Sequence, residues 1–373
     1  YFMKIFFMIT HIFIGITNIF CNYIFLQINL SLRMNPAELI NFLEKLIKNN
    51  LNISTMIWGP PGIGKSSIVY SAAEKAGIDF IDLRLSQLAP TDLRGLPVPV
   101  HPEDEKKQGT SKWYPPEFLP REGKGILFLD ELNMAPPVMQ GVAQQLILDR
   151  KIGSYEVPEG WRIFSAGNRK EDRASVFEMP TPLANRFIHI EVEANYESFK
   201  NYAINKNLAE EVTSFLAFRP NLLHVMNTDQ KAWPSPRSWE MASQLFKNNI
   251  PIDIAVGEGA ASEFNSYINV YKSIPDLQRI LKGHGKNIPF PKKISSQWAT
   301  TTGLIYRSKN PKDVNNVFVW LIQNSSPEWT QLYASDIVNS FKNSGKLSEL
   351  AKVVMNDPKI IQYFKNFEDI LNK

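Results

Sequence analysis

Residues 59–66 carry the feature that most restricts how this chain can fold. They read Gly-Pro-Pro-Gly-Ile-Gly-Lys-Ser, which fits the pattern G-x-x-x-x-G-K-S. The short apolar stretch 54–58 before them is typical of a buried strand. The stretch 66–76 after them has the apolar period of a helix and is followed by Gly77. A chance glycine-rich turn would not need these flanking elements, so the order of strand, loop and helix predicts a phosphate-binding loop, or P-loop.

The predicted loop supplies donors for phosphate oxygens. Glycines let its backbone N–H groups point inward, and the helix start adds the positive end of its dipole. We expect Lys65 to face solvent and reach the β- and γ-phosphates, with the Ser66 hydroxyl on Mg²⁺. The residues expected to contact the nucleotide are Gly59, Pro60, Pro61, Gly62, Ile63, Gly64, Lys65, Ser66 and Ser67. The expected cofactors are ATP and Mg²⁺, while GTP stays open because no base-reading motif is visible.

A second stretch, 125–131, is an apolar run that ends in Asp130 and Glu131. Such a run indicates a strand buried on both faces of a parallel sheet, and ligands collect at the carboxyl ends of such strands. Asp130 is expected to hold Mg²⁺ through its water shell, and Glu131 to polarise the attacking water. Two solvated acids that merely end a strand would give the same sequence pattern, but the P-loop earlier in the chain favours the catalytic interpretation.

Composition limits the class of protein. The 373 residues suggest two or three domains. The net charge of +4 is too weak to argue for nucleic-acid binding by itself. The chain has a single cysteine, Cys21, which excludes an internal disulfide and a cysteine metal site. It fits a reducing compartment, and we expect a cytoplasmic protein.

Residues 1–33 form an apolar leader rich in Phe and Ile, and three interpretations stay open. It could be a transmembrane anchor, an uncleaved signal-like segment, or sequence read upstream of the true start. The third is favoured because Met34 precedes a conventional helix start, with Asn35 as N-cap, Pro36 first and Glu38 reaching back. A membrane contact is expected only if the leader is native.

The order of elements predicts an α/β fold. Five strands with helical crossovers indicate a doubly wound parallel sheet with helices on both faces, over a core at 34–195. A proline-rich insertion at 84–124 is expected to hold small elements of its own, packed through Trp113, Tyr114 and Phe118. From residue 196 on the pattern is helical only, and we expect a lid at 196–262 and a helical C-terminal region at 263–373.

With these pieces placed, the chain resembles an AAA+ ATPase, and within that group the MoxR-like and dynein-related branch. The resemblance covers about 60–260, and it is carried by 59–66, 126–131 with Asn133 and 135–137, 165–168, 183–187 and 235–237. It implies that Asn168 senses the γ-phosphate, that Arg186 is an arginine finger, and that Arg237 of the lid contacts the nucleotide. Read from the residues alone, Asn168 could be a turn former, Arg186 a structural salt-bridge residue, and Arg237 a surface cation. Arg173 is a second candidate for the finger.

The resemblance implies an ATP-driven chaperone or remodeller that works as a ring, with six subunits expected. Its target would be another protein, for example one with a metal-ion-dependent adhesion fold. The alternative is a nucleic-acid motor or loader, including the nucleotide-hydrolysing subunit of a restriction-type system. That alternative needs basic residues converging on a pore, and the candidates are Lys106, Lys107, Lys112 and Lys151. A nucleotide-gated scaffold is a third class, against which Glu131, Asn168 and Arg186 argue.

Overall fold

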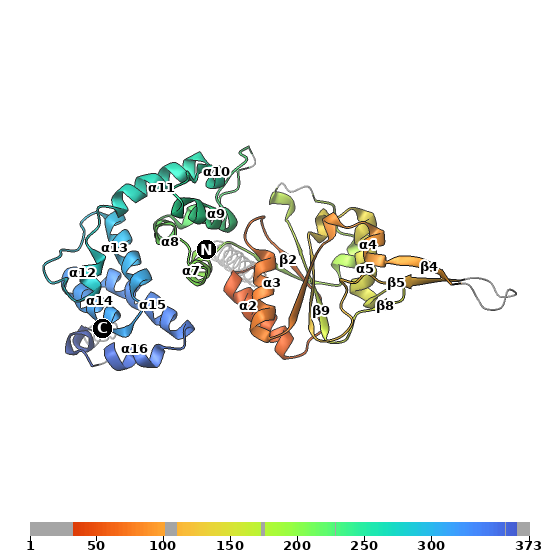
Figure 1. Ribbon diagram of the computed structural model, residues 1–373, viewed down its shortest axis with the longest axis horizontal. Coiled ribbons are helices and arrows are strands. Elements are labelled where there is room, and N and C mark those ends of the chain that lie inside the picture. Colours follow the sequence, from red (N-terminus) through yellow and green to blue (C-terminus); the bar gives the residue numbers. More distant parts are fainter. Residues whose placement is uncertain (1–32, 101–109, 173–175, 228, 355, 364–373) are drawn as a thin grey trace, which may run out of the picture. The chain divides into compact units, whose positions relative to one another are not determined.

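The chain divides into two compact units, an N-terminal unit up to Ser198 and a C-terminal unit from Phe199 on. The computed structural model describes residues 33–100, 110–172, 176–227, 229–354 and 356–363. Within these residues, the N-terminal unit holds a sheet with helices, and the C-terminal unit holds helices and no strand (Figure 1).

The N-terminal unit is built on a parallel sheet of six strands in the order β1-β10-β2-β9-β6-β3. The strands are β1 (Arg33–Met34), β2 (Thr55–Trp58), β3 (Asp79–Arg84), β6 (Gly125–Asp130), β9 (Trp161–Gly167) and β10 (Ile188–Val192). The expected doubly wound parallel sheet is confirmed, with the two-residue β1 added beside β10. Because every strand runs the same way, the sheet has one carboxyl end and one amino end, and ligands favour the first.

Both faces of this sheet are buried, which explains its unbroken apolar runs. Helix α5 (Pro137–Asp149) covers one face, and α2 (Pro36–Lys48) and α3 (Lys65–Ala76) cover the other. Leu127 of β6 packs into the core under α5, whereas its neighbour Phe128 packs into the core under α2 and α3. Removing one such side chain costs about 2–5 kcal/mol, so the sheet is a firm support for the groups at its ends.

The helix ends follow the local signals of the sequence. The Asn35 side chain accepts a hydrogen bond from the Glu38 N–H at 3.0 Å, and Glu38 accepts one from the Asn35 N–H at 2.9 Å. This is the predicted capping box at the start of α2. Helix α3 ends at Gly77, whose φ of 65° is the left-handed conformation that glycine adopts most readily.

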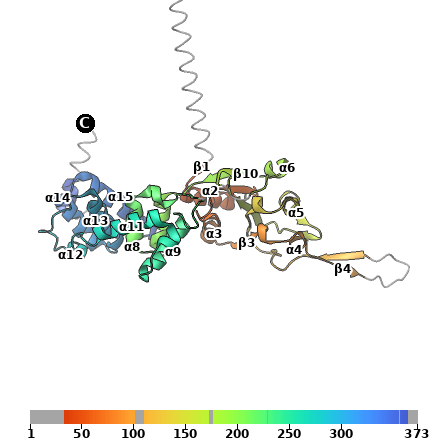
Figure 2. The ribbon, with the colours of Figure 1, turned by 90° about the horizontal axis from the view of Figure 1, so that it is seen from above.

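The insertion at 84–124 contains small elements, as predicted. They are the 3₁₀ turn η1 (Leu85–Gln87), helix α4 (Pro90–Arg94) and the antiparallel strands β4 (Leu96–Val100) and β5 (Thr110–Tyr114). The hairpin formed by β4 and β5 extends away from the sheet in both views (Figures 1 and 2). A second short hairpin, β7 (Lys151–Ile152) and β8 (Tyr155–Glu156), follows α5.

The packing prediction for the insertion was wrong for Tyr114 and Phe118, which are 51% and 37% exposed. The buried anchors are instead leucines that pack into the core under α5: Leu85, Leu93 and Leu119. The Tyr114 ring remains outside because Tyr114 lies on the solvent face of the hairpin, opposite Leu96. Trp113, on the other face, is half-buried.

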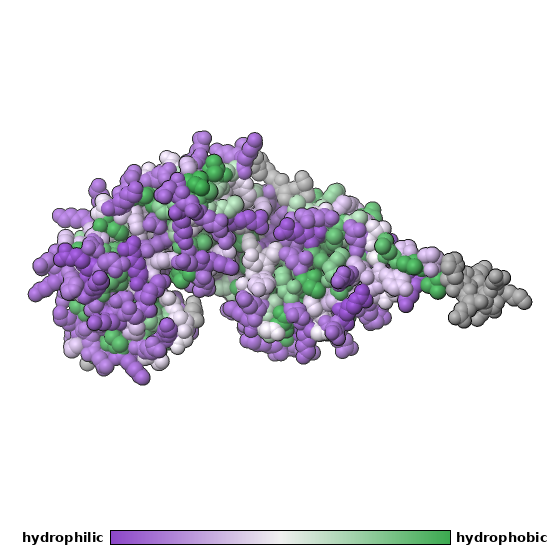
Figure 3. Space-filling view, in the orientation of Figure 1, coloured by the Kyte–Doolittle hydropathy of each residue, from purple (hydrophilic) through white to green (hydrophobic). Residues whose placement is uncertain are grey.

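The solvent face of this hairpin is apolar along β4. Leu96, Val98 and Val100 alternate along β4 and are each more than 40% exposed, and hydrophobic surface is visible on the hairpin in Figure 3. Pro97 and Pro99 lie between them and carry no backbone N–H. Edge prolines prevent strand-to-strand aggregation, so the face is available while the β4 edge is protected.

The C-terminal unit is an assembly of helices, which confirms the helical region expected after the core. Its helices are α7 (Tyr196–Asn205, beginning at the end of the N-terminal unit), α8 (Glu210–Phe218), α9 (Pro236–Lys247), α10 (Asp253–Val256), α11 (Glu258–Tyr271), α12 (Leu277–Leu281), α13 (Ile294–Arg307), α14 (Pro311–Asn324), α15 (Pro327–Asn343) and α16 (Leu347–Val354). Lys200 of α7 pairs with Asp336 of α15 at 2.8 Å, and both side chains are largely buried. The expected boundary at 262 falls within α11, so the division into a lid and a further region stays a proposal.

Within the described parts of the chain, no helix is long and apolar enough to cross a membrane. The leader at 1–33 lies outside the described residues except for Arg33, which belongs to β1. Arg33 forms ion pairs with Glu191 at 3.2 Å and Glu193 at 2.9 Å. The three interpretations of the leader therefore stay predictions.

Candidate active site

The P-loop lies between β2 and α3, at the carboxyl end of the sheet, as predicted. Gly62 and Gly64 have φ angles of 82° and 88°, in the left-handed region that other residues rarely adopt. Gly59 is needed for a different reason, because a Cβ there would lie 2.7 Å from the Val192 carbonyl oxygen. These glycines let the chain turn tightly from strand into helix, which is the shape that directs N–H groups at an anion.

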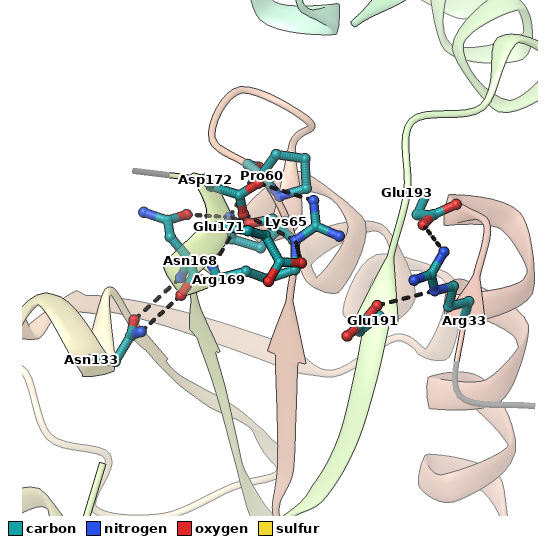
Figure 4. A network of polar contacts seen from close by, with 11 residues as sticks. Arg33, Pro60, Lys65, Asn133, Asn168, Arg169, Glu171, Asp172, Glu191 and Glu193 are labelled. Atoms are coloured by element: carbon teal, nitrogen blue, oxygen red, sulfur yellow. Dashed lines mark hydrogen bonds and ion pairs between the residues drawn. The ribbon is translucent and has the colours of Figure 1, made fainter. Parts of the chain in front are cut away.

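Lys65 does not face solvent as expected, because its side chain is only 9% exposed. Its Nζ donates to the carbonyl oxygens of Gly59 at 2.8 Å and Pro60 at 3.2 Å, and to Asn168 Oδ1 at 2.8 Å. The physical reason is that the carbonyls of the tight loop and the neighbouring amide offer the ammonium group acceptors close by. Lys65 and Asn168 are thereby brought into direct contact (Figure 4).

Ser66 and Asp130, the two expected Mg²⁺ contacts, lie side by side. The Ser66 hydroxyl donates to Asp130 Oδ2 at 2.9 Å. In the described residues no group of three or more His, Cys, Asp or Glu side chains could hold a metal. A nucleotide-bound Mg²⁺ does not need one, since it takes one or two protein oxygens and fills its shell with phosphates and water. The pair therefore fits Mg²⁺ of that kind.

Negative charge gathers at this end of the sheet. Desolvation, followed by repulsion from Asp130, raises the pKa of Asp82 on the neighbouring strand β3. A smaller contribution comes from Glu131. Repulsion of this kind is relieved by a bound cation, so the electrostatics agree with a metal next to Asp130.

Glu131 follows β6 in the left-handed conformation, with a φ of 57°. Its backbone N–H donates to Asp130 Oδ1 at 2.9 Å, and its carboxylate accepts a hydrogen bond from the Ser86 hydroxyl. Sequence reasoning missed Ser86. In the register of β3 and β6, Arg84 lies opposite Asp130. A residue just after β3 can therefore reach Glu131, which follows Asp130.

Asn168 follows β9, which lies beside β2 with Gly167 opposite Trp58. This neighbourhood explains how Asn168 reaches Lys65. The main chain of Asn168 is bound in turn by the side chain of Asn133, a contact that sequence reasoning did not assign. Asn133 lies in the 3₁₀ turn η2 (Leu132–Met134), directly after Glu131.

Arg169, next to Asn168, carries an unassigned positive charge near the P-loop (Figure 4). It donates two hydrogen bonds to the buried Asp172, from Nε at 3.0 Å and Nη2 at 2.9 Å. The hydrogen bonds to Asp172 raise the pKa of the Arg169 guanidinium. This bidentate pair holds the segment after β9 in place.

Arg186 lies at the other end of the sheet, between helix α6 (Thr181–Ala184) and β10. Strand β10 begins opposite Thr55, the first residue of β2, whereas the P-loop begins after Trp58, the last residue of β2. Arg186 is exposed, and no hydrogen bond or ion pair of its side chain occurs within the described ranges. The alternative of a structural salt bridge is therefore not seen there. Arg173, the second candidate, lies outside the described residues.

A histidine fixes the segment that carries Arg186. His189 Nδ1 accepts a hydrogen bond from Trp58 Nε1 at 2.9 Å, and its Nε2 lies 2.9 Å from the Ala184 carbonyl oxygen. Because a carbonyl only accepts, Nε2 carries the proton. His189 thus ties the end of α6 to the strand that leads into the P-loop.

Arg237 belongs to the C-terminal unit, in the first turn of α9. The predicted helix start is confirmed, since Ser235 accepts a hydrogen bond from the Ser238 N–H at 3.1 Å and Pro236 is the first helical residue. Arg237 is exposed and has no ion pair in the part of the chain that the structure describes. Its contact with a nucleotide stays a prediction.

The fold and this cluster of side chains define a P-loop nucleoside triphosphatase. Residues 55–147 match the family described as ATPase family associated with various cellular activities (AAA), so this part of the chain is an AAA ATPase domain. Such domains bind and hydrolyse ATP, and the chain is accordingly an enzyme, an ATPase.

Similar proteins are found in both sequence and structure. Midasin from Giardia intestinalis is 28% identical over 148 residues, which cover 37% of this chain and 3% of Midasin. The chain thus spans a small fraction of the length of that curated relative. Among solved structures, NtrX from Brucella abortus gives a TM-score of 0.36 at 16% identity, covering 79% of this chain and 67% of that chain. The RuvB Holliday junction branch migration motor from Thermotoga maritima gives 0.33 at 13% identity, covering 88% and 86%.

Proposed function

We propose that this protein is an ATP-driven remodeller of the MoxR-like, dynein-related branch, acting on a protein target as a cytoplasmic ring of six subunits. The observation that carries the proposal is the separation of Arg186 from the polar groups around the P-loop. Lys65, Asp130 and Asn168 gather at the carboxyl end of the sheet, while Arg186 is exposed near the amino end of β10. A ring of identical subunits brings such different surfaces together.

Each residue at the carboxyl end has a role that follows from its chemistry. The P-loop N–H groups and Lys65 bind phosphate oxygens, and Ser66 and Asp130 would hold Mg²⁺, which neutralises phosphate charge. Glu131 takes a proton from the attacking water, as a positioned carboxylate can. Asn168 is 2.8 Å from the Lys65 ammonium and orients the water or the γ-phosphate.

Arg186 supplies charge to the nucleotide of a neighbouring subunit in this proposal. Along β2 the P-loop starts four residues beyond Thr55, roughly 13 Å at the rise of a strand. The bonds of His189 to Trp58 and Ala184 hold the Arg186 segment to the same rigid sheet. Return of Arg186 to its own P-loop would require breaking them.

A protein target suits the surface better than nucleic acid does. The hairpin of β4 and β5 presents exposed Leu96, Val98 and Val100, and exposed apolar patches mark protein contacts. Of the lysines that nucleic acid would need, Lys151 pairs with Glu156 at 3.4 Å and Lys112 lies over the Tyr114 ring at 5.5 Å. Lys106 and Lys107 lie outside the described residues. The resemblance suggests a target with a metal-ion-dependent adhesion fold, and similarity to Midasin is compatible with the branch.

Stimulation of ATP hydrolysis distinguishes the two target classes. The purified chain is assayed alone, with single- and double-stranded DNA, and with proteins recovered on a Glu131→Gln variant that holds ATP. We expect a recovered protein, but not DNA, to raise wild-type turnover several-fold. The Lys65→Ala variant, which should not hold ATP, is the matched control for recovery. Turnover raised by DNA alone would replace the remodeller with the nucleic-acid motor.

A further inference from the structure

The Asn133 side chain forms two hydrogen bonds with the main chain of Asn168. Its Nδ2 donates to the Asn168 carbonyl oxygen at 2.8 Å, and its Oδ1 accepts from the Asn168 N–H at 3.2 Å. Figure 4 shows the two bonds side by side. The Asn133 side chain thus bonds both the N–H and the C=O of one residue, as a neighbouring strand would, and only 4% of Asn133 is exposed.

The contact is also sterically tight. A Cβ on Gly167 would lie 2.5 Å from Asn133 Oδ1, closer than such atoms approach in folded proteins. The residue before Asn168 therefore has no side chain at the place where the amide packs. This close approach fixes the position of the Asn168 main chain relative to Asn133.

Asn133 stands at a junction of three catalytic segments. It follows Glu131 by two residues, in the same tight turn. Its own carbonyl oxygen accepts a hydrogen bond from the Phe177 N–H at 2.7 Å, within the segment that leads to α6 and Arg186. The side chain of Asn168 accepts a hydrogen bond from Lys65 Nζ and donates one to Met134 Sδ at 3.2 Å.

We propose that Asn133 is a positioning residue for ATP hydrolysis. It holds the Asn168 main chain so that the Asn168 amide stays aimed at Lys65, and it keeps Asn168 in register with Glu131. Asn133 does not touch the reacting atoms and acts through Asn168. The inference rests on the proposed roles of Glu131 and Asn168.

A buried amide could serve stability alone, and the chain offers a matched control for that case. Gln140 of α5 is fully buried and donates from Nε2 to the Ala135 carbonyl oxygen at 3.0 Å. It belongs to the same unit, also bonds a main-chain group, and forms no hydrogen bond with Asn168 within the described residues. Gln140→Ala should therefore destabilise the fold to a similar degree without affecting the catalytic step.

The test is a double-mutant cycle on kcat with the full chain. Small displacements of catalytic groups cost up to about 100-fold, so we expect Asn133→Ala to lower kcat by about 10- to 100-fold. ATP affinity should stay within about threefold of wild type, because the P-loop is intact. In the Asn168→Ala background, Asn133→Ala should lower kcat by less than about twofold, since its effect passes through Asn168. Gln140→Ala should keep the wild-type kcat.

Two results overturn the inference. One is a kcat of Asn133→Ala that matches that of Gln140→Ala at equal thermal stability. The other is a double variant whose fold-loss in kcat equals the product of the fold-losses of the two single variants. If Asn133→Ala does not fold, Asn133→Asp carries the same cycle, because it is nearly isosteric and replaces the donor to the Asn168 carbonyl with a negatively charged acceptor oxygen. A wild-type kcat in Asn168→Ala would instead refute the proposed role of Asn168, so the two failures are distinguishable.

Discussion

The two ends of the central sheet differ in how their polar side chains are partnered. At the carboxyl end, Lys65 binds Asn168, Ser66 binds Asp130, and Glu131 accepts from Ser86. At the other end, Arg186 is exposed and forms no side-chain hydrogen bond or ion pair within the described ranges. The carboxyl end holds a network of bonded groups, and Arg186 near the amino end presents its charge outward.

This difference indicates which functions one chain can perform alone. A network of mutually bonded groups is prepared to bind a nucleotide and its metal. An exposed guanidinium on a rigid segment is suited to a partner that approaches from outside. We infer that one subunit binds ATP by itself, and that rapid hydrolysis needs a second subunit.

The largest expected effect is at the amino end of the sheet. Arg186→Ala should lower turnover by about 10³–10⁵-fold, which corresponds to about 4–7 kcal/mol of transition-state stabilisation. ATP affinity should change little, because the P-loop is untouched. Steady-state ATPase assays at saturating ATP measure this, with Arg279→Ala, which removes an exposed arginine of α12, as the control. Near-normal turnover would make Arg186 an ordinary surface residue.

Glu131→Gln tests the carboxyl end at the chemical step. Gln keeps the shape of the side chain and removes the base, so turnover should fall by about 10²–10⁴-fold while ATP still binds. Single-turnover hydrolysis and equilibrium binding separate the two quantities. If the variant hydrolyses ATP at the wild-type rate, another residue activates the water.

Lys65→Ala tests binding at the same end. Loss of a phosphate contact should weaken ATP binding by at least about tenfold, or over about 1 kcal/mol. The fold should survive, because the acceptors of Lys65 are loop carbonyls and Asn168 rather than core groups. Calorimetric titration and thermal unfolding measure the two effects. Affinity within about twofold of wild type would contradict the assignment of Lys65.

Sequence patterns predicted the features of this unit that depend on local order. The glycines of 59–64, the flanking strand and helix, and the Asn35 capping box are each set by residues close together in the chain. Adjacent apolar residues such as Leu127 and Phe128 predicted a strand buried on both faces. These signals were sufficient for the fold and for the positions of Lys65, Ser66 and Asp130 at the carboxyl end of the sheet, but not for the burial of Lys65.

Contacts between separate strands were not visible in the same way. Ser86 reaches Glu131 because β3 lies beside β6, and Asn133 reaches Asn168 because η2 packs at the end of β9. Neither adjacency has a local signature in the sequence. Tyr114 failed as a packing anchor for a similar reason, because its strand register places it on the solvent face of the hairpin.

Mixing two inactive variants tests the shared site most directly. Arg186→Ala and Lys65→Ala subunits are combined in equal amounts, and ATP turnover is measured over a range of protein concentrations. In a randomly mixed ring, about a quarter of the interfaces join an intact P-loop to an intact Arg186, so about a quarter of wild-type turnover should return. Turnover should also rise with concentration as rings assemble. Mixtures as inactive as the separate variants, with wild-type turnover independent of concentration, would contradict a site shared between subunits.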